Sequence, residues 1–393
     1  MRSLYYMKHL SQSFSVKFEY QIYFTAGIFN KTNTLFNDFL LNSATSLSTR
    51  KIFFVVDKGV TDAHPNLIQN IQDYFSLYNK VQLVQDILVV PGGETAKNDL
   101  LYFNQVVEAV NAYGIDRHSY IAAIGGGAVL DMVGYAAAVS HRGIKHIRIP
   151  TTVLSQNDSG IGVKNGINFF SKKNFLGTFV PPTVVFNDEQ FLETLTDRDW
   201  RSGISEAVKV ALLKDADFFT WIEQNTTALV KRDMNTMNHL IWKCAQLHME
   251  HIAGADPFES GSSRPLDFGH WSAHKLEYLS NFEVRHGEAV AMGIALDTIY
   301  SNLSGRISEQ ESDRVIQTLQ NLGFEVSHHL LQVDGNNSPI LAGIEEFREH
   351  LGGQLTIMLL NGIGEGEEVH EIDTEILKQA AKKLEEIHRL KLQ

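Results

Sequence analysis

The sequence of 393 residues is short of cysteine, of basic charge and of long apolar runs. Its single cysteine, Cys244, excludes an internal disulfide and fits a reducing compartment. No stretch reaches the roughly 18 apolar residues of a membrane span, and the first residues lack the apolar core of a signal peptide. These absences predict a cytoplasmic protein that does not enter a membrane.

Basic residues are outnumbered, with 34 Lys and Arg against 46 Asp and Glu and a formal net charge of -12. This balance argues against a nucleic-acid or membrane-surface partner, since both require stripes of Lys or Arg. A local cluster of cations could still bind a small phosphorylated substrate. Hydrophobic residues make up 44% of the chain, as in ordinary globular proteins, and the length predicts two domains.

The first half alternates strand and helix signals. Strand-like runs occur at 51–57, 81–94, 119–127 and 145–154, and helical patterns lie between them. This alternation predicts βαβ units and a mostly parallel sheet. We therefore expect an α/β domain over residues 1–189.

The second half has helical periodicity. Apolar residues recur at three- and four-residue spacing over 199–224 and 234–254, and a serine-capped helix is indicated over 308–323. Residues 354–372 resemble a hairpin around Asn-Gly, and residues from 374 onward form an amphipathic pattern. We expect a mostly helical domain over 190–393, with the cleft between the domains as the default site.

Two glycine-rich turns follow predicted strands. "AIGGGAVLD" (123–131) would let the backbone approach a pyrophosphate at a helix N-terminus, although a plain strand-to-helix turn is an alternative. "PGGETAK" (91–97) adds Glu94 and Lys97, which could bind ribose hydroxyls and phosphate or belong to a solvated loop.

Residues 149–182 form a long polar segment after a strand. A surface loop of such length without function is uncommon, and its cations and amides suit a phosphate-bearing polyol. The polar residues in question are Thr151, Thr152, Asp158, Lys164, Asn168, Lys173 and Asn174.

Histidines and one carboxylate suggest a metal site. His270 and His274 are four residues apart and would share a helix face, and His286 follows. Glu206 would complete a carboxylate and two-imidazole set, a common arrangement for catalytic zinc. Alternatively, the histidines are structural, and Glu206 forms an exposed ion pair with Lys209.

The motifs, in their order and spacing, resemble the dehydroquinate synthase-like sugar phosphate cyclases from about residue 50 to residue 295. The matching stretches are "GGETAK", "GGGAVLD", "HRGIKHIRIPTT", "DSGIGVKNGIN", "KKNFLGTF", "FLETL", "EAVK", "DFGHWSAH" and "HGEAVAMG". The resemblance implies a Rossmann-like NAD-binding domain, a C-terminal helical metal-binding domain and a homodimer.

The resemblance also implies roles for particular residues. Glu206, His270 and His286 would bind a divalent metal, usually zinc, with cobalt as an alternative. The NAD contacts would be Asp57, Glu94, Lys97, Gly126, Gly127, Asp131, Thr151, Thr152, Lys164, Lys173 and Thr194. The substrate would be lined by Arg142, Asp158, Lys164, Asn174, Lys209 and His274, with Arg142, Lys164 and Asn174 nearest its phosphate.

The implied reaction oxidises a ring hydroxyl transiently with NAD, eliminates phosphate, returns the hydride and closes a carbocycle by an intramolecular aldol step. Lys209 and His274 would shuttle protons, with Asp158 and Lys164 also in the catalytic set. NAD would be catalytic and not consumed.

Several positions depart from dehydroquinate synthases. Met249 and Ser263 stand where those enzymes have a lysine and an arginine that read a carboxylate, with Arg264 one place away, and Asp267 replaces an asparagine. For a late phosphate-side lysine, His350 is the nearest candidate.

These departures favour a 2-epi-valiolone synthase-type branch that uses sedoheptulose 7-phosphate, a neutral sugar phosphate. Three alternatives stay open. The first is 3-dehydroquinate synthase, which acts on the carboxylated heptulosonate 7-phosphate. The second is a metal- and NAD-dependent polyol or glycerol-phosphate dehydrogenase. The third is a cofactor-binding protein without turnover.

Overall fold

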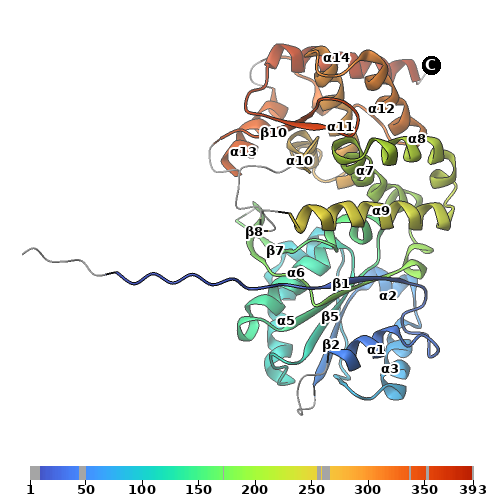
Figure 1. The fold of residues 1–393 in the computed structure, drawn as a ribbon, viewed down its shortest axis with the longest axis vertical. Coiled ribbons are helices and arrows are strands. Elements are labelled where there is room, and N and C mark those ends of the chain that lie inside the picture. Colours follow the sequence, from blue (N-terminus) through green and yellow to red (C-terminus); the bar gives the residue numbers. More distant parts are fainter. Residues whose placement is uncertain are drawn as a thin grey trace, which may run out of the picture.

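The computed structural model describes residues 9–43, 50–170, 172–254, 258, 266–335, 338–350 and 354–391. It has a parallel sheet with helices in the N-terminal part and a helical C-terminal part (Figure 1). This agrees with the fold class predicted from the sequence. None of the described helices combines the length and the apolar character that a membrane span requires.

The N-terminal part is built on a seven-stranded sheet of order β1-β9-β6-β5-β2-β3, in which β4 also pairs with β2. Every pairing in this sheet is parallel, as the strand and helix alternation predicted. The strands are β1 (Gln21–Thr25), β2 (Lys51–Asp57), β3 (Gln82–Leu83), β4 (Leu88–Val90), β5 (Tyr120–Gly125), β6 (Lys145–Pro150) and β9 (Val184–Asp188).

Helices pack on both faces of this sheet, because alternate residues of the central strands are apolar on each side. On β2, Phe54 and Val56 join one buried cluster, whereas Phe53 and Val55 join another on the opposite face. The helices are α1 (Leu35–Asn42), α2 (Lys58–Ala63), α3 (Leu67–Leu77), α4 (Glu94–Asn98), α5 (Leu100–Ala112) and α6 (Gly127–Val139), followed by η1 (Ser140–Arg142).

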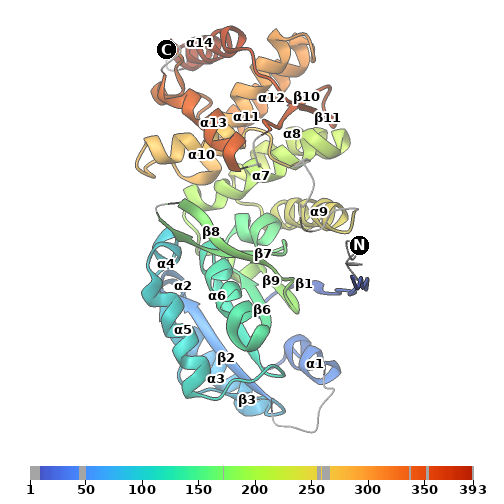
Figure 2. The same cartoon turned by 90° about the vertical axis from the view of Figure 1, so that its left-hand side faces the viewer.

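The composition of the polar segment 149–182 suggested a long loop, but the segment is largely structured. It forms a π-turn, η2 (Ser155–Ser159), and an antiparallel hairpin of β7 (Lys164–Phe169) and β8 (Lys172–Phe179). The hairpin lies against α6, on the side of the sheet that faces the C-terminal helices (Figure 2). Arg148 is buried and donates hydrogen bonds to the carbonyl oxygens of Gly160, Gly162 and Lys164. These bonds fix the root of the hairpin, which the polar composition alone did not reveal.

The C-terminal part is a bundle around α11, whose residues are almost all buried. The predicted late hairpin and terminal helix are both present. The helices are η3 (Glu189–Leu192), α7 (Asp197–Lys214), α8 (Ala216–Val230), α9 (Met234–Ile252), α10 (His270–Leu279), α11 (His286–Leu303), α12 (Glu309–Asn321), η4 (His329–Leu331), η5 (Pro339–Leu341), α13 (Ala342–His350) and α14 (Thr374–Lys391). The hairpin strands are β10 (Ile357–Leu360) and β11 (Gly366–Val369). Cys244 is buried in this bundle, as expected.

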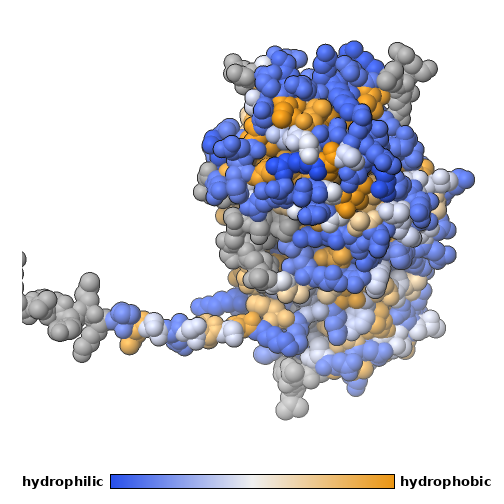
Figure 3. Space-filling view, turned by 45° about the horizontal axis from the view of Figure 1, so that its top comes forward, coloured by the Kyte–Doolittle hydropathy of each residue, from blue (hydrophilic) through white to orange (hydrophobic). Residues whose placement is uncertain are grey.

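The segment before β1 extends away from the body (Figure 1). Its apolar side chains Leu10, Phe14 and Val16 are exposed. Figure 3 shows that the visible face is otherwise mostly hydrophilic, with apolar patches over the C-terminal part. The N-terminal segment gave no functional prediction from the sequence.

Candidate active site

Three helices bring together the carboxylate and the two imidazoles singled out in the sequence. Glu206 lies in the middle of α7, and His270 and His286 are the first residues of α10 and α11. One ligand atom from each lies within 4.8 Å of the others. Oε1 of Glu206 is 3.5 Å from Nε2 of His270 and 3.3 Å from Nε2 of His286. The three side chains can therefore bind one ion.

Close glycine contacts allow the helices to approach. Gly269 has a φ of 76° and turns the chain just before His270. A Cβ on Gly293 of α11 would lie 2.1 Å from the carbonyl oxygen of Gly269, and one on Gly287 would lie 2.1 Å from that of Ser202. Only glycine fits at such backbone contacts. The sequence thus lets α11 rest directly on α7 and on the start of α10.

The electrostatics of this cluster fit a bound cation. Both carboxylate oxygens of Glu206 are buried and, among the described residues, receive no hydrogen bond of normal geometry. Burial opposes its charge, but Lys209 and His270 hold the pKa of Glu206 well below its usual range. Burial likewise opposes a charge on His286, yet the neighbouring carboxylates of Glu206 and Glu277 raise its pKa to about 10. The negative charge available here, with two nitrogens and one oxygen, suits zinc.

His274 lies one helical turn after His270. Its ring centroid is 5.4 Å from that of His270 and 5.8 Å from that of His286, and its side chain is solvent-exposed. Although the side chain is partly open to solvent, desolvation by the surrounding atoms and the two neighbouring imidazoles lower the pKa of His274 well below its usual range. Because it is exposed beside the ligand cluster, a substrate on the metal could reach it.

Lys209 is buried against Glu206, and the alternative of an exposed Glu206–Lys209 ion pair is wrong. Burial opposes its charge, but Glu206 and Asp158, with a smaller contribution from Asp267, raise the pKa of Lys209. Asp158 on η2 places Oδ1 3.1 Å from Nδ1 of His248 on α9. His248 was missed in the sequence because no motif marks it and its partner lies far away in the chain.

The glycine turns of the sheet converge on Asp57. Oδ1 of Asp57 accepts a hydrogen bond from the Gly59 N–H at 2.8 Å, and a Cβ on Gly92 would lie 2.5 Å from its Oδ2. Gly126 precedes α6, and a Cβ on Gly127 would lie 2.5 Å from Oγ of Ser159. These turns lie at the carboxyl ends of parallel strands, where doubly wound folds bind ligands.

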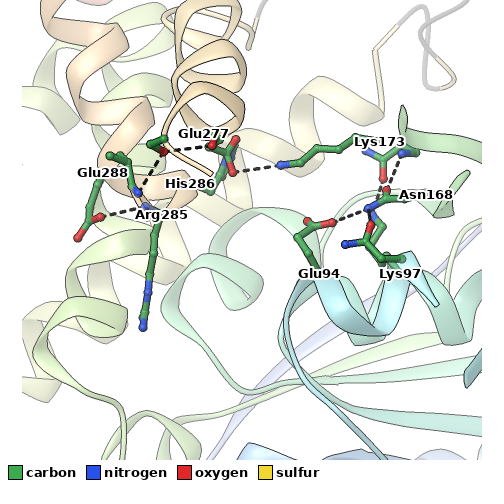
Figure 4. A network of polar contacts seen from close by, with 12 residues as sticks. Glu94, Lys97, Asn168, Lys173, Glu277, Arg285, His286 and Glu288 are labelled. Carbon is green, nitrogen blue, oxygen red and sulfur yellow. Dashed lines mark hydrogen bonds and ion pairs between the residues drawn. The ribbon is translucent and has the colours of Figure 1, made fainter. Parts of the chain in front are cut away.

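Residues of α4 contact the hairpin (Figure 4), and α4 also packs against α6. Nζ of Lys97 is 2.8 Å from Oδ2 of Asp131 and also contacts Asn174. Nδ2 of Asn168 donates to Oε2 of Glu94 at 2.7 Å. The structure therefore joins residues from "PGGETAK", "GGGAVLD" and the polar segment.

Other predicted cofactor and substrate residues lie around this edge. The Thr151 N–H donates to the Gly125 carbonyl oxygen at 3.1 Å, and the Thr152 hydroxyl is 2.8 Å from that of Ser155. Lys164 begins β7 and is exposed. Thr194 lies farther along the edge, with its hydroxyl 2.9 Å from Nε2 of His64. A hollow there is lined by residues that include Gly27, His64, Asp188, Gln190 and Phe191.

Four predicted substrate residues are not placed in this cluster. Arg142 follows the far end of α6, so about 20 Å of helix separates it from the glycine turn of its own chain. Met249 is half-buried on α9, next to His248. Arg264 lies outside the described residues, together with Ser263. His350 ends α13, and its side chain is likewise not described.

Comparison with known proteins identifies the family. The model described as 3-dehydroquinate synthase N-terminal matches residues 87–202, and that described as 3-dehydroquinate synthase C-terminal matches residues 203–341. A 3-dehydroquinate synthase of Acinetobacter baumannii (strain SDF) is 35% identical over 294 residues, covering 74% of this chain and 80% of the relative. That of Vibrio atlanticus (strain LGP32) is 34% identical over 313 residues, covering 78% and 83%.

Solved structures agree with this assignment. ValA (2-epi-5-epi-valiolone synthase) from Streptomyces hygroscopicus subsp. jinggangensis 5008, with NAD+ and Zn2+ bound, has a TM-score of 0.84 at 28% identity and covers 96% of this chain and 99% of its own. A 2-deoxy-scyllo-inosose synthase complexed with carbaglucose-6-phosphate, NAD+ and Co2+ has a TM-score of 0.75 at 22% identity, covers 92% and 96%, and shows the fold alone.

The family matches and the similar proteins define the class: this chain is a phosphate-eliminating carbon–oxygen lyase. The chain belongs to the dehydroquinate synthase-like family of sugar phosphate cyclases, as its motifs predicted.

Proposed function

We propose that the protein is an NAD- and metal-dependent cyclase that converts sedoheptulose 7-phosphate to a valiolone-type cyclitol. The proposal is supported by Met249 and Asp267, which stand where the resemblance to dehydroquinate synthases places a carboxylate-reading lysine and an asparagine. Asp267 is close enough to Lys209 for its charge to raise the pKa of that lysine. An added acid and a missing cation both disfavour a carboxylated substrate, because an unpaired buried charge costs several kcal/mol.

Glu206, His270 and His286 would hold the metal, zinc or cobalt, and the residues around Asp57, Gly126 and Lys97 would hold NAD. When bound, the metal polarises a substrate hydroxyl as a Lewis acid, and NAD accepts and returns a hydride. ValA, 28% identical, was solved with NAD+ and Zn2+, which supports both assignments.

The chain's own residues would position the sugar phosphate and move protons. Lys209 and His274 lie on two sides of the proposed ligand set and would exchange protons with the substrate, and Asp158 lies beside Lys209. Lys164 and Asn174, from the two strands of one hairpin, would contact the phosphate. With these roles assigned, the three metal ligands take no part in proton transfer.

A homodimer would explain the position of Arg142. In its own chain, this residue lies about 20 Å of helix away from the glycine turn. We therefore assign Arg142 to the phosphate site of a second copy.

The test is release of inorganic phosphate by purified protein supplied with NAD and zinc or cobalt. Sedoheptulose 7-phosphate is compared with the carboxylated heptulosonate 7-phosphate, and the Met249→Lys variant is assayed beside the unaltered protein. We expect release only from the neutral sugar by the unaltered protein. Release only from the carboxylated sugar would contradict the substrate assignment.

3-Dehydroquinate synthase is the second candidate. Curated relatives of 34% and 35% identity carry that name, and Arg264 is one position from the expected arginine. Under this alternative, only the carboxylated substrate would release phosphate, and Arg264→Ala would abolish that activity.

A further inference from the structure

Glu277 on α10 contacts two partners from different parts of the fold, Lys173 and His286 (Figure 4). Its Oε2 is 3.1 Å from Nδ1 of His286, and its Oε1 is 3.1 Å from Nζ of Lys173 on β8. The Glu277 side chain is only 5% exposed, whereas its partners Lys173 and His286 are 34% and 31% exposed. This carboxylate therefore joins the hairpin of the N-terminal part to a proposed metal ligand.

The imidazole of His286 uses its two nitrogens on opposite sides. Nε2 is directed to Glu206, and Nδ1 to Glu277. A metal-binding histidine commonly donates its second ring N–H to a carboxylate, which fixes the tautomer and the ring orientation. Glu277 occupies that place. His274, Glu277 and His286 also offer ligand atoms within 4.8 Å of one another, so Glu277 lies beside both imidazole rings.

The Lys173 side of the bridge continues into the proposed dinucleotide site. The next residue, Asn174, contacts Lys97 with its side chain, and its N–H donates to Oδ1 of Asn168 at 2.8 Å. Asn168 in turn binds Glu94. Side-chain and backbone contacts thus run from α4, through both strands of the hairpin, to α10 and the first residue of α11.

We propose that Glu277 is the positioning residue for His286, and that the Lys173–Glu277 ion pair couples metal binding to NAD binding. The inference rests on the proposed function, which assigns a metal to Glu206, His270 and His286 and NAD to the α4 side. NAD on Glu94, Lys97 and Lys173 itself would order the hairpin and keep the Lys173 ammonium beside Glu277, so that His286 is oriented before the metal arrives. Coupling of two binding sites is reciprocal, so the metal would tighten NAD binding by the same factor.

The experiment measures zinc affinity of the metal-free full chain by competition with a chromogenic chelator, without NAD and with saturating NAD. The unaltered protein should bind zinc about 5-fold or more tightly with NAD. Glu277→Gln should weaken zinc binding about 10–100-fold under both conditions. Because Lys173 is also a proposed NAD contact, NAD is raised until it saturates each variant. Lys173→Met should then remove the effect of NAD on zinc binding, and Lys173→Arg should keep it. Glu277→Gln, which leaves Lys173 in place, should remove it as well.

Lys172→Met is the matched control, because Lys172 is the neighbouring, exposed lysine of the same strand. It should keep the full NAD effect. The coupling is overturned if NAD leaves the zinc affinity of the unaltered protein unchanged. It is also overturned if NAD tightens zinc binding equally in Lys173→Met and in the unaltered protein. A zinc affinity of Glu277→Gln equal to that of the unaltered protein would overturn the positioning role. If that variant does not fold, the comparison of Lys173→Met with Lys173→Arg decides whether the ion pair with Glu277 supports zinc binding. A chain that binds no zinc or no NAD would overturn the proposed function as well.

Discussion

The carboxylate of Asp297 on α11 accepts a hydrogen bond at 3.0 Å from the N–H of Gly269, the residue before His270. Its other oxygen accepts the indole N–H of Trp271 at 3.0 Å. The buried acid therefore fixes the residues on both sides of His270, and with them the position of this proposed metal ligand. Burial raises the pKa of Asp297 to about 7, although both hydrogen bonds oppose this shift.

This pKa predicts a pH dependence of stability. A carboxyl whose pKa is raised from 3.8 to about 7 on folding stabilises the folded chain fully at low pH, and this contribution is lost as the pH rises toward 7. The stability advantage of the unaltered, metal-free protein over Asp297→Asn should fall by up to about 4 kcal/mol between pH 4 and pH 8. Urea unfolding in the presence of a chelator measures it, and a pH-independent difference would count against a raised pKa.

Gly287 tests the approach of the helices. In Gly287→Ala, the new Cβ would lie 2.1 Å from the backbone oxygen of Ser202, so α11 must move away from α7. We expect a loss of about 1–3 kcal/mol in unfolding free energy and weaker zinc binding, because His286 moves with the helix. Gly335→Ala is the control, since no heavy atom lies within 4 Å of a Cβ there. Equal effects of the two variants would refute the packing argument.

Glu206 should be indispensable for metal binding. Glu206→Gln removes the ligand charge beside Lys209 and should weaken zinc binding more than the roughly 10–100-fold expected for an outer carboxylate. Glu288→Gln is the control, because Glu288 also lies on the α11 side of the site but pairs with Arg198. Calorimetric titration with zinc measures the zinc affinity of both variants. Similar affinities in Glu206→Gln and Glu288→Gln would exclude Glu206 as a ligand.

Arg142 should act in the site of the second copy. Arg142→Ala and Lys209→Met should each be inactive alone, whereas mixing and re-assembling them should restore about a quarter of the activity, because half of the dimers are mixed and each has one intact site. Phosphate release from the mixture measures this recovery. No recovery, despite mixed dimers in native mass spectrometry, would place Arg142 in its own chain's site or outside any site.

Much of the fold followed from local patterns in the sequence. Apolar strands such as residues 51–57 and the late Asn-Gly hairpin carry their periodicity within a few residues, and both appear as expected. The three proposed ligands were found through residue type and motif. The hairpin of residues 164–179 was not predicted, because its stability depends on the distant, buried guanidinium of Arg148. Glu277 and His248 were missed for the same reason: their partners come from remote segments.

The central claim is a phosphate-eliminating reaction in which NAD is regenerated. The most direct measurement records phosphate release and absorbance of NADH together, in one reaction with NAD, zinc and either heptulose phosphate. We expect many equivalents of phosphate per chain and no accumulation of NADH. Accumulation of NADH in step with substrate consumption, without phosphate release, would contradict this claim and would indicate a dehydrogenase.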